Sequence, residues 1–176
     1  ISKKLHAAVM WLVAIGGNLS AYWILVANGF MQNPVGYEIV NGRAQMISIG
    51  ALLGNPRAIL LFLHTFFSGL VTAAFFILGF SIYHLVRNHE TEAFKKSFYL
   101  SALIGLIATA GVIDIGHLQG IYLRQVQPMA AAASEAHYET ADPAAFHLIA
   151  GIDQTGRKTT WSITIPKALS MLYFFR

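Results

Sequence analysis

The stretch AAVMWLVAIGGNLSAYWILVANGF, residues 7–30, has no charged side chain and decides the fold class. A helix needs about 20 consecutive apolar residues to cross the hydrocarbon core of a bilayer. A helix at the surface of a soluble core would show a polar face at a period of 3.6 residues, and this stretch does not. Two further stretches are comparably apolar and contain no Lys or Arg, with Asp114 as their one carboxylate, so we predict three transmembrane helices at about 6–30, 58–86 and 98–118.

The composition of the whole chain agrees with a membrane protein. Of its 176 residues, 56% are hydrophobic and only 11% are charged, whereas a soluble domain carries about 25% charged residues. The sequence has no cysteine, which excludes a disulfide scaffold and any zinc or iron–sulfur site held by cysteines. The basic residues are scattered among apolar segments, which favours a role in orienting the chain in a lipid bilayer over binding of nucleic acid. We therefore expect an all-α, polytopic helical membrane protein.

Basic residues beside the helices predict the orientation, because cytoplasmic flanks carry an excess of Lys and Arg. One side carries five such residues and the other three: Lys3, Lys4, Arg87, Lys95 and Lys96 against Arg43, Arg57 and Arg124. We therefore expect residues 1–5 and 87–97 in the cytoplasm, and residues 31–57 and 119–176 outside it.

The chain is expected to have two parts, 1–122 with the three helices and 123–176 outside the membrane. Turn signals in 31–57 indicate an external loop, with room for a short helix in the membrane interface; they are Asn33-Pro34, Asn41-Gly42 and Asn55-Pro56. Residues 127–140 are rich in helix formers, whereas 161–176 fit no secure secondary structure. The chain opens with Ile1 and has no signal-peptide pattern, so we expect a piece of a longer membrane protein.

His64, in the run LLFLHTFFSG, is the most informative polar residue within a predicted membrane helix. It lies about two turns inside the outer end of the second helix. A neutral imidazole at that depth can ligate a haem iron, and Ser68 and Gly69 are small enough for a flat macrocycle to approach the helix. The alternative is a histidine that hydrogen-bonds a neighbouring helix.

Carboxylate and imidazole groups near the outer interface form a second set of candidates. Glu135 and Glu139 lie four apart in a stretch expected to be helical, so they would share a face. Together with His117, such groups could accept protons from a lipid-soluble hydroquinone, or they are simply solvated. In the first helix, His6 is either a solvated interfacial residue or a proton carrier. Ser20 follows Gly16 by four residues, a spacing typical of close helix contact, with a proton relay as the alternative.

Several blocks of the sequence resemble subunit I of cytochrome bd-type quinol oxidases. The run GGNLSAYWILVANGFMQNPVG is long enough to be highly specific, and four further blocks follow in the family's order. They are GRAQM, NPRAILLFLHTFFSGLVTAAFFILG, QVQPMAAAASEAHYET and GIDQ…ITIP, and together the blocks cover nearly all of the chain from His6 to Pro166.

The resemblance implies a fold and an activity. The three helices would be the fourth, fifth and sixth of a larger subunit, followed by the start of its extracytoplasmic quinol loop. The family sits in the plasma membrane of bacteria and archaea, pairs with a subunit II and in some cases small accessory subunits, and oxidises ubiquinol or menaquinol. It passes electrons through a low-spin haem b to a high-spin haem b and a haem d, where dioxygen is reduced to water.

The resemblance also implies roles for single residues. His64 matches the histidine ligand of the low-spin haem b, and Glu135 matches the quinol-loop glutamate linked to quinol oxidation. His6 matches a histidine near the proton route, and Ser20 a serine on a proton channel. His117 stands where some members carry an aspartate near the quinol site. The ligands of haem d and of the high-spin haem b lie in parts of the family's subunit beyond this stretch.

Two alternatives from other functional classes remain open at this point. One is a catalytically silent module that only packs beside other membrane subunits. The other is a haem b anchor of a different respiratory complex, which would need a second histidine facing His64 at similar depth. His117 is the only candidate for that second histidine on the outer side, and it lies nearer the water.

Overall fold

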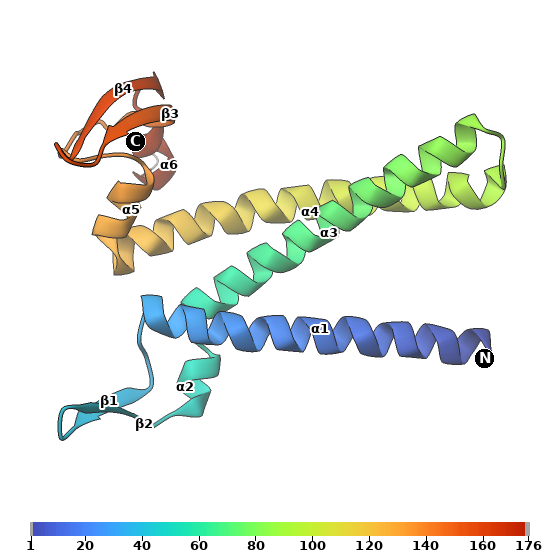
Figure 1. Cartoon of the computed structure of the whole chain (residues 1–176), viewed down its shortest axis with the longest axis horizontal. Helices are drawn as coiled ribbons and strands as arrows, with labels where there is room; N and C mark the ends of the chain where they lie inside the picture. The colour runs from blue at the N-terminus through green and yellow to red at the C-terminus, as the bar shows by residue number, and fades with distance from the viewer. Residues whose placement is uncertain (1, 175–176) are drawn as a thin grey trace. The chain divides into compact units, whose positions relative to one another are not determined.

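A computed structural model describes residues 2–174 and contains six helices and four strands within them (Figure 1). In chain order they are α1 (Lys3–Gln32), β1 (Tyr37–Val40), β2 (Arg43–Met46), α2 (Ile49–Leu53), α3 (Pro56–Val86), α4 (Thr91–Val126), α5 (Pro128–Ser134), β3 (Phe146–Asp153), β4 (Lys158–Ile165) and α6 (Ala168–Phe174). The chain divides into two compact units, Ile1–Gly116 and His117–Arg176.

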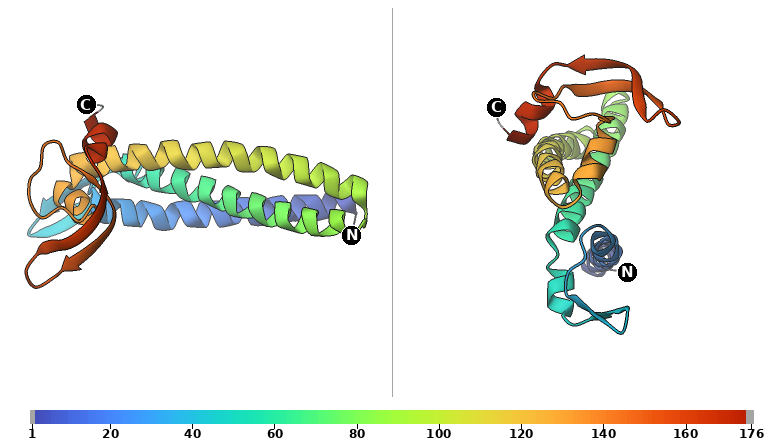
Figure 2. Two further views of the ribbon diagram at one scale, coloured as in Figure 1. Left: turned by 90° about the horizontal axis from the view of Figure 1, so that it is seen from above. Right: turned by 90° about the vertical axis from the view of Figure 1, so that its left-hand side faces the viewer.

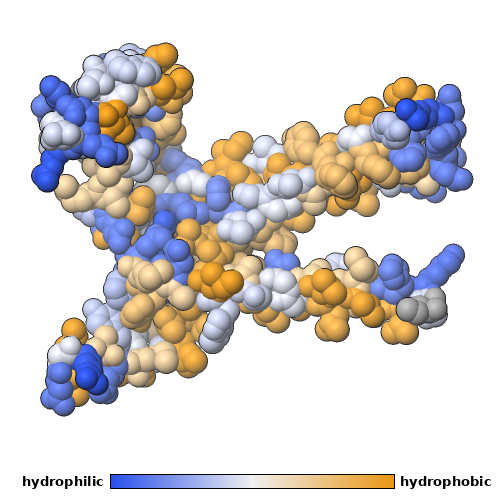
Figure 3. Space-filling view, viewed as in Figure 1, coloured by the Kyte–Doolittle hydropathy of each residue, from blue (hydrophilic) through white to orange (hydrophobic). Residues whose placement is uncertain are grey.

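Within residues 2–174, three helical segments are long and apolar enough to cross a membrane, which confirms the three predicted helices; they are Lys3–Gln32, Ile49–Val86 and Thr91–Val126. Large apolar side chains along them face outward, and Phe76 is 74% exposed. Figure 3 shows the apolar colouring along the helical rods and the hydrophilic colouring at their ends. A soluble protein would bury this surface, so the exposed apolar residues indicate contact with lipid or with further membrane helices.

Helix α4 is longer than the predicted span of 98–118. Hydropathy marks only the stretch that crosses the apolar core, while the helix itself continues through polar residues to Val126. It ends there because Gln127 precedes Pro128, whose ring disfavours helical geometry in the residue before it. Gln127 accordingly has φ −142° and ψ 68°.

Helices α1 and α3 meet at the end of α1 through a close glycine contact and a set of polar side chains. A Cβ added to Gly29 would lie 2.9 Å from the Cβ of Ala58. Asn55 is fully buried and caps α3, because its Oδ1 accepts a hydrogen bond from the Arg57 amide at 3.0 Å. Its Nδ2 donates to the Asn33 carbonyl oxygen at 2.9 Å, and Arg57 Nε donates to Gln32 Oε1 at 2.6 Å. The Asn55-Pro56 turn signal therefore marks both a helix start and a joint between two helices.

Helices α3 and α4 run antiparallel and are joined by a short connection (Figure 2). Small residues of α4 face larger ones of α3: added Cβ atoms at Gly111 and Gly116 would lie 2.7 Å from Phe67 and 3.3 Å from His64. Near the connection, the ring of His84 stacks on that of Phe94 with centroids 4.3 Å apart. The two glycines thus let α3 and α4 approach each other closely beside Phe67 and His64.

The expectation of an all-α chain is correct for the mostly helical class but missed two antiparallel hairpins. Strands β1 and β2 are joined by Asn41 and Gly42, whose φ angles of 51° and 75° are those of a tight hairpin turn. Strands β3 and β4 pair from Phe146↔Ile165 to Asp153↔Lys158. Residues 161–176, which had no assigned structure, supply much of β4 and all of α6. The short helix expected in the external loop is α2.

Candidate functional site

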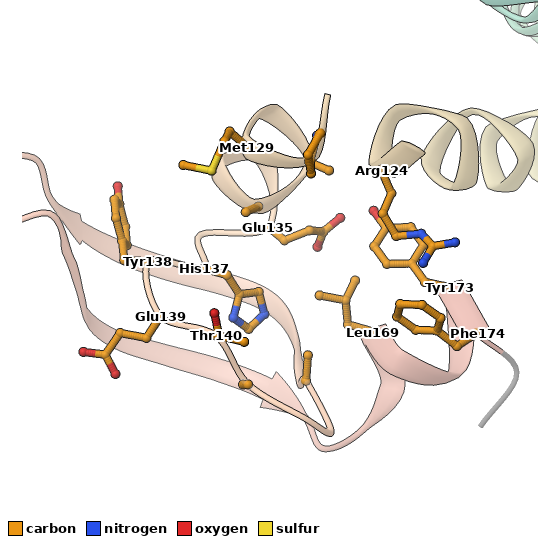
Figure 4. Close-up of a pocket in the computed structure, with 15 residues that line it drawn as sticks. Arg124, Met129, Glu135, His137, Tyr138, Glu139, Thr140, Leu169, Tyr173 and Phe174 are labelled. Atoms are coloured by element: carbon orange, nitrogen blue, oxygen red, sulfur yellow. The ribbon is translucent and has the colours of Figure 1, made fainter. Parts of the chain in front are cut away.

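A cavity of about 420 Å³ lies within the second unit (Figure 4). Its wall combines the last turn of α4, helix α5, the segment that follows α5, and helix α6. The titratable side chains around it include Arg124, Glu135, His137 and Tyr173. Apolar and aromatic side chains make up much of the remaining wall, so the cavity suits a flat, mostly apolar molecule with a few polar atoms.

Glu135 ends helix α5, and the prediction that the helix continues through Glu139 is wrong. The amide of His137 donates to the Ala132 carbonyl oxygen at 2.9 Å, which closes the helix in a Schellman-type cap. Ala136 has φ 55°, so the backbone reverses there. Glu135 and Glu139 therefore do not share a helix face, and Glu135 lines the cavity as the residue that caps α5.

Two histidines hold the segment after α5 against strand β3. His137 Nε2 lies 2.9 Å from the Ala145 carbonyl oxygen, and His147 Nδ1 lies 2.9 Å from the Glu135 carbonyl oxygen. Their rings stack with centroids 4.5 Å apart and planes 21° apart. The Thr159 hydroxyl of β4 donates to the Ala136 carbonyl oxygen at 2.6 Å, so both strands of the hairpin fix the position of Glu135.

The surroundings of Glu135 make its carboxylate a stronger base than an ordinary surface carboxylate. Burial raises the pKa of Glu135, and the nearby imidazoles of His137 and His147 oppose that rise. The pKa of Tyr173 is raised by burial and by Glu135, against the effect of Arg124. The Arg124 guanidinium lies 4.1 Å from the Phe174 ring centroid and 5.8 Å from that of Tyr173. The site thus combines a basic carboxylate with aromatic walls, an arrangement able to hold a hydroxylated ring and accept its proton.

The other predicted proton-handling residues lie elsewhere. His117 lies on α4 about two turns before Arg124 and does not line the cavity. His6 and Ser20 are both exposed on α1. Fourteen residues separate them, which is about 21 Å along a helix, so the structure does not bring these two together.

His64 faces α4 in the first unit. Its Nδ1 is buried and has no hydrogen-bond partner among residues 2–174. The small residue beside it is Gly116 of α4. Gly69, which the sequence predicts to leave room for a macrocycle to approach the helix, lies about 140° further around α3, and an added Cβ there would meet no described atom within 4 Å. Burying an imidazole nitrogen without a hydrogen-bond partner costs free energy. His64 is therefore suited to be the ligand of a metal ion such as a haem iron.

No group of three or more His, Asp or Glu side chains in the described range could hold a metal ion. A single imidazole is nevertheless enough for an iron whose other ligands come mainly from a porphyrin. His64 is the residue that the family resemblance implies for such a ligand.

Comparison with known proteins identifies the family. The family model described as cytochrome bd terminal oxidase subunit I matches residues 1–175. The cytochrome bd ubiquinol oxidase subunit 1 of Bacillus subtilis (strain 168) is 46% identical over 175 residues, which cover 99% of this chain and 37% of that protein. The cytochrome bd-II ubiquinol oxidase subunit 1 of Escherichia coli (strain K12) is 38% identical, over 98% of this chain and 34% of that protein.

A solved structure agrees with these relatives. The bd oxidase from Geobacillus thermodenitrificans superposes with a TM-score of 0.81 at 28% identity, covering all of this chain and 40% of the solved chain. The chain therefore spans well under half the length of the relatives that it matches. Because the family model extends over nearly every residue, the chain belongs to the cytochrome bd terminal oxidase subunit I family.

Proposed function

We propose that this chain is the central part of a subunit of a terminal respiratory oxidase that oxidises membrane quinol and reduces dioxygen to water. The observation that carries the proposal is Glu135, a half-buried carboxylate with a raised pKa in an aromatic-walled cavity. The relatives of this chain are named as ubiquinol oxidase subunits. The chain would work in a bacterial plasma membrane, together with the rest of its own subunit and a subunit II.

The cavity would bind the quinol head group and take a proton from it. The Glu135 carboxylate would accept a hydrogen bond from one quinol hydroxyl and then its proton. Leu169 and Tyr173 of α6 and Met129 of α5 would contact the ring. Burial against the largely apolar wall would keep the carboxylate basic until the substrate arrives.

His64 would hold a low-spin haem b through an imidazole nitrogen. When bound, this haem supplies a one-electron acceptor for quinol oxidation in the complete oxidase, with a high-spin haem b and a haem d beyond it. The contribution of this chain would be the imidazole of His64, which lies beside α4 where Gly116 has no side chain; a Cβ there would lie 3.3 Å from the ring. The membrane depth of His64 and the unpartnered Nδ1 support this assignment.

The test of the proposal is Glu135→Gln in the complete oxidase, with Glu38→Gln as its control. Gln keeps the size and hydrogen bonding of Glu135 but loses its basicity, so quinol turnover should fall about 10²-fold or more. Haem content and oxygen consumption with an artificial one-electron donor should stay normal. Glu38 is an exposed carboxylate on β1, and its replacement should change none of these quantities.

Two results would contradict this assignment. Normal quinol turnover in Glu135→Gln would show that the carboxylate is a bystander. Loss of haem together with turnover would show that it serves the fold.

A further inference from the structure

The hydrogen bonds of the two stacked histidines determine which nitrogen of each ring is basic. A carbonyl oxygen only accepts hydrogen bonds, so His137 Nε2 must carry a hydrogen to bond Ala145 at 2.9 Å. In the neutral ring, Nδ1 of His137 is therefore the nitrogen with the free electron pair. By the same reasoning, His147 carries its hydrogen on Nδ1, which bonds the Glu135 carbonyl oxygen.

The stacking limits how many protons the pair can take. With ring centroids 4.5 Å apart, two imidazolium ions would repel each other strongly. Both rings interact electrostatically with the Glu135 carboxylate. The cluster of Glu135, His137 and His147 can thus take up two protons, one on the carboxylate and one on a single imidazole. Of the two histidines, His137 lines the cavity.

Other charged or titratable groups face the same cavity. Helix α4 contributes Arg124 and helix α6 contributes Tyr173, while Tyr138 and Glu139 come from the segment after α5. From β4, the contact near Glu135 is the neutral hydroxyl of Thr159. The positive charge of Arg124 adds to the reasons against a second imidazolium, so the capacity of the cluster stays at two protons.

We infer that His137 is a second proton acceptor of this cavity and that His147 is the positioning residue that holds it there. The inference rests on the proposed quinol oxidation. Conversion of a hydroquinone to a quinone breaks two O–H bonds and releases two protons and two electrons. One proton goes to the Glu135 carboxylate and the other to His137 Nδ1. The two electrons leave singly to the oxidant, a ferric haem of the complete oxidase, and the quinone departs.

The first variant is His137→Gln in the complete oxidase. The Gln amide still donates to the Ala145 carbonyl oxygen but has no basic nitrogen. Quinol kcat should fall about tenfold to a hundredfold, with KM within about threefold of the parent value. On the acidic side, log(kcat/KM) against pH should change its limiting slope from two to one, because only Glu135 then has to be deprotonated. Turnover with a one-electron donor should be unchanged.

Three companion variants separate a chemical role from a structural one. His137→Ala leaves a space of imidazole size, so imidazole added to the buffer should restore part of the quinol turnover. His147→Asn keeps an N–H donor for the Glu135 carbonyl oxygen but removes the stacked ring, so turnover should fall less than in His137→Gln. His89→Gln, at an exposed histidine in the connection between α3 and α4, should behave like the parent.

The outcomes distinguish this inference from the proposed function. If Glu135→Gln loses quinol turnover while His137→Gln keeps its turnover and the slope of two, only the inference on His137 fails. If turnover falls in His137→Gln without a change of slope, and imidazole does not rescue His137→Ala, His137 is structural and the inference also fails. Loss of haem in both His137 variants would overturn it as well. Normal quinol turnover in Glu135→Gln would contradict the proposed function itself.

Discussion

Gly29 allows a direct test of how tightly α1 and α3 meet. A Cβ added there would lie 2.8 Å from the Ala58 nitrogen, 2.9 Å from its Cβ and 3.0 Å from its Cα. Non-bonded carbon atoms rest at about 3.5–4.0 Å, so Gly29→Ala leaves a shortfall of about 0.5–1 Å. Two of the three atoms are backbone atoms, which no side-chain rotation can move. The helices would have to separate by roughly the same distance.

The separation would weaken the polar contacts that join the two helix ends. Arg57 Nε donates to Gln32 Oε1 at 2.6 Å, and Asn55 Nδ2 donates to the Asn33 carbonyl oxygen at 2.9 Å. Each such bond contributes about 0.5–1.5 kcal/mol net, and overpacking adds about 1–3 kcal/mol. Partial loss of the bonds together with the overpacking gives a destabilisation of about 2–4 kcal/mol.

The measurement is the temperature at which the complete oxidase in detergent irreversibly loses its haem absorbance, at one fixed scan rate. Gly29→Ala should lower this temperature by about 5 °C or more. Gly17→Ala is the matched control in the same helix, since its added Cβ would meet no described atom within 4 Å. Adding Ala58→Gly removes only one of the three clashing atoms, so it should recover less than half of the loss. An unchanged midpoint in Gly29→Ala, or complete recovery in the double variant, would refute the tight contact.

Three further predictions concern the haem ligand, the orientation and the pH dependence of stability. His64→Ala should abolish the low-spin haem b band in a reduced-minus-oxidised spectrum while the protein stays inserted; an unchanged band would rule His64 out as the ligand. A cysteine at Asn88 should react with a membrane-impermeant reagent only after the cells are permeabilised, and labelling of intact cells would reverse the predicted orientation. Because burial raises the pKa of Glu135 above 4.5, the folded state favours its protonated form, and the stability from that preference is lost as pH rises through the folded-state pKa. At pH 7.5, Glu135→Gln should therefore be at least as heat-stable as the parent. As the pH falls toward 5, the heat stability of the parent should rise relative to that of the variant. A variant that is less stable than the parent at pH 7.5 would falsify the assigned burial effect.

The three membrane helices could be predicted from the sequence because their signal is local and long. Each apolar stretch exceeds the length that a bilayer requires, and no tertiary contact is needed to recognise it. The hairpins are different, since a strand of a few residues is stable only through its partner. Asn41-Gly42 was recognised as a turn, but the flanking strands have four residues each and little periodicity to count. In β4, Ser162 and Thr164 alternate with Ile163 and Ile165, but this short local pattern forms a sheet only with its partner strand β3.

The candidate site was predictable only in part, because its residues come from distant segments. Glu135 is predicted both as a carboxylate near the outer interface and from the family resemblance, and His137 lies in the same stretch predicted to be helical. Arg124, His147 and Tyr173 reach the same unit from α4, β3 and α6, and no local pattern relates those positions. The helix predicted through Glu139 followed from the propensity of the alanine-rich run, which the contacts with the hairpin override at Ala136.

The backbone at Ala136 explains why a two-stranded hairpin belongs to this site at all. A left-handed conformation costs an alanine about 1–2 kcal/mol, and such strain persists only where surrounding contacts enforce it. Here β4 supplies the Thr159 bond to the Ala136 carbonyl oxygen, and β3 supplies the His147 bond to that of Glu135. If α5 simply continued, Glu135 would lie on the side of a helix instead of at its end, and the hydrogen bond from His137 to Ala145 would be lost. The contacts with the hairpin therefore end the alanine-rich helix at Glu135 and place its carboxylate in the cavity wall. Substitutions in β3 or β4 that break these contacts should displace Glu135 before other residues of the site.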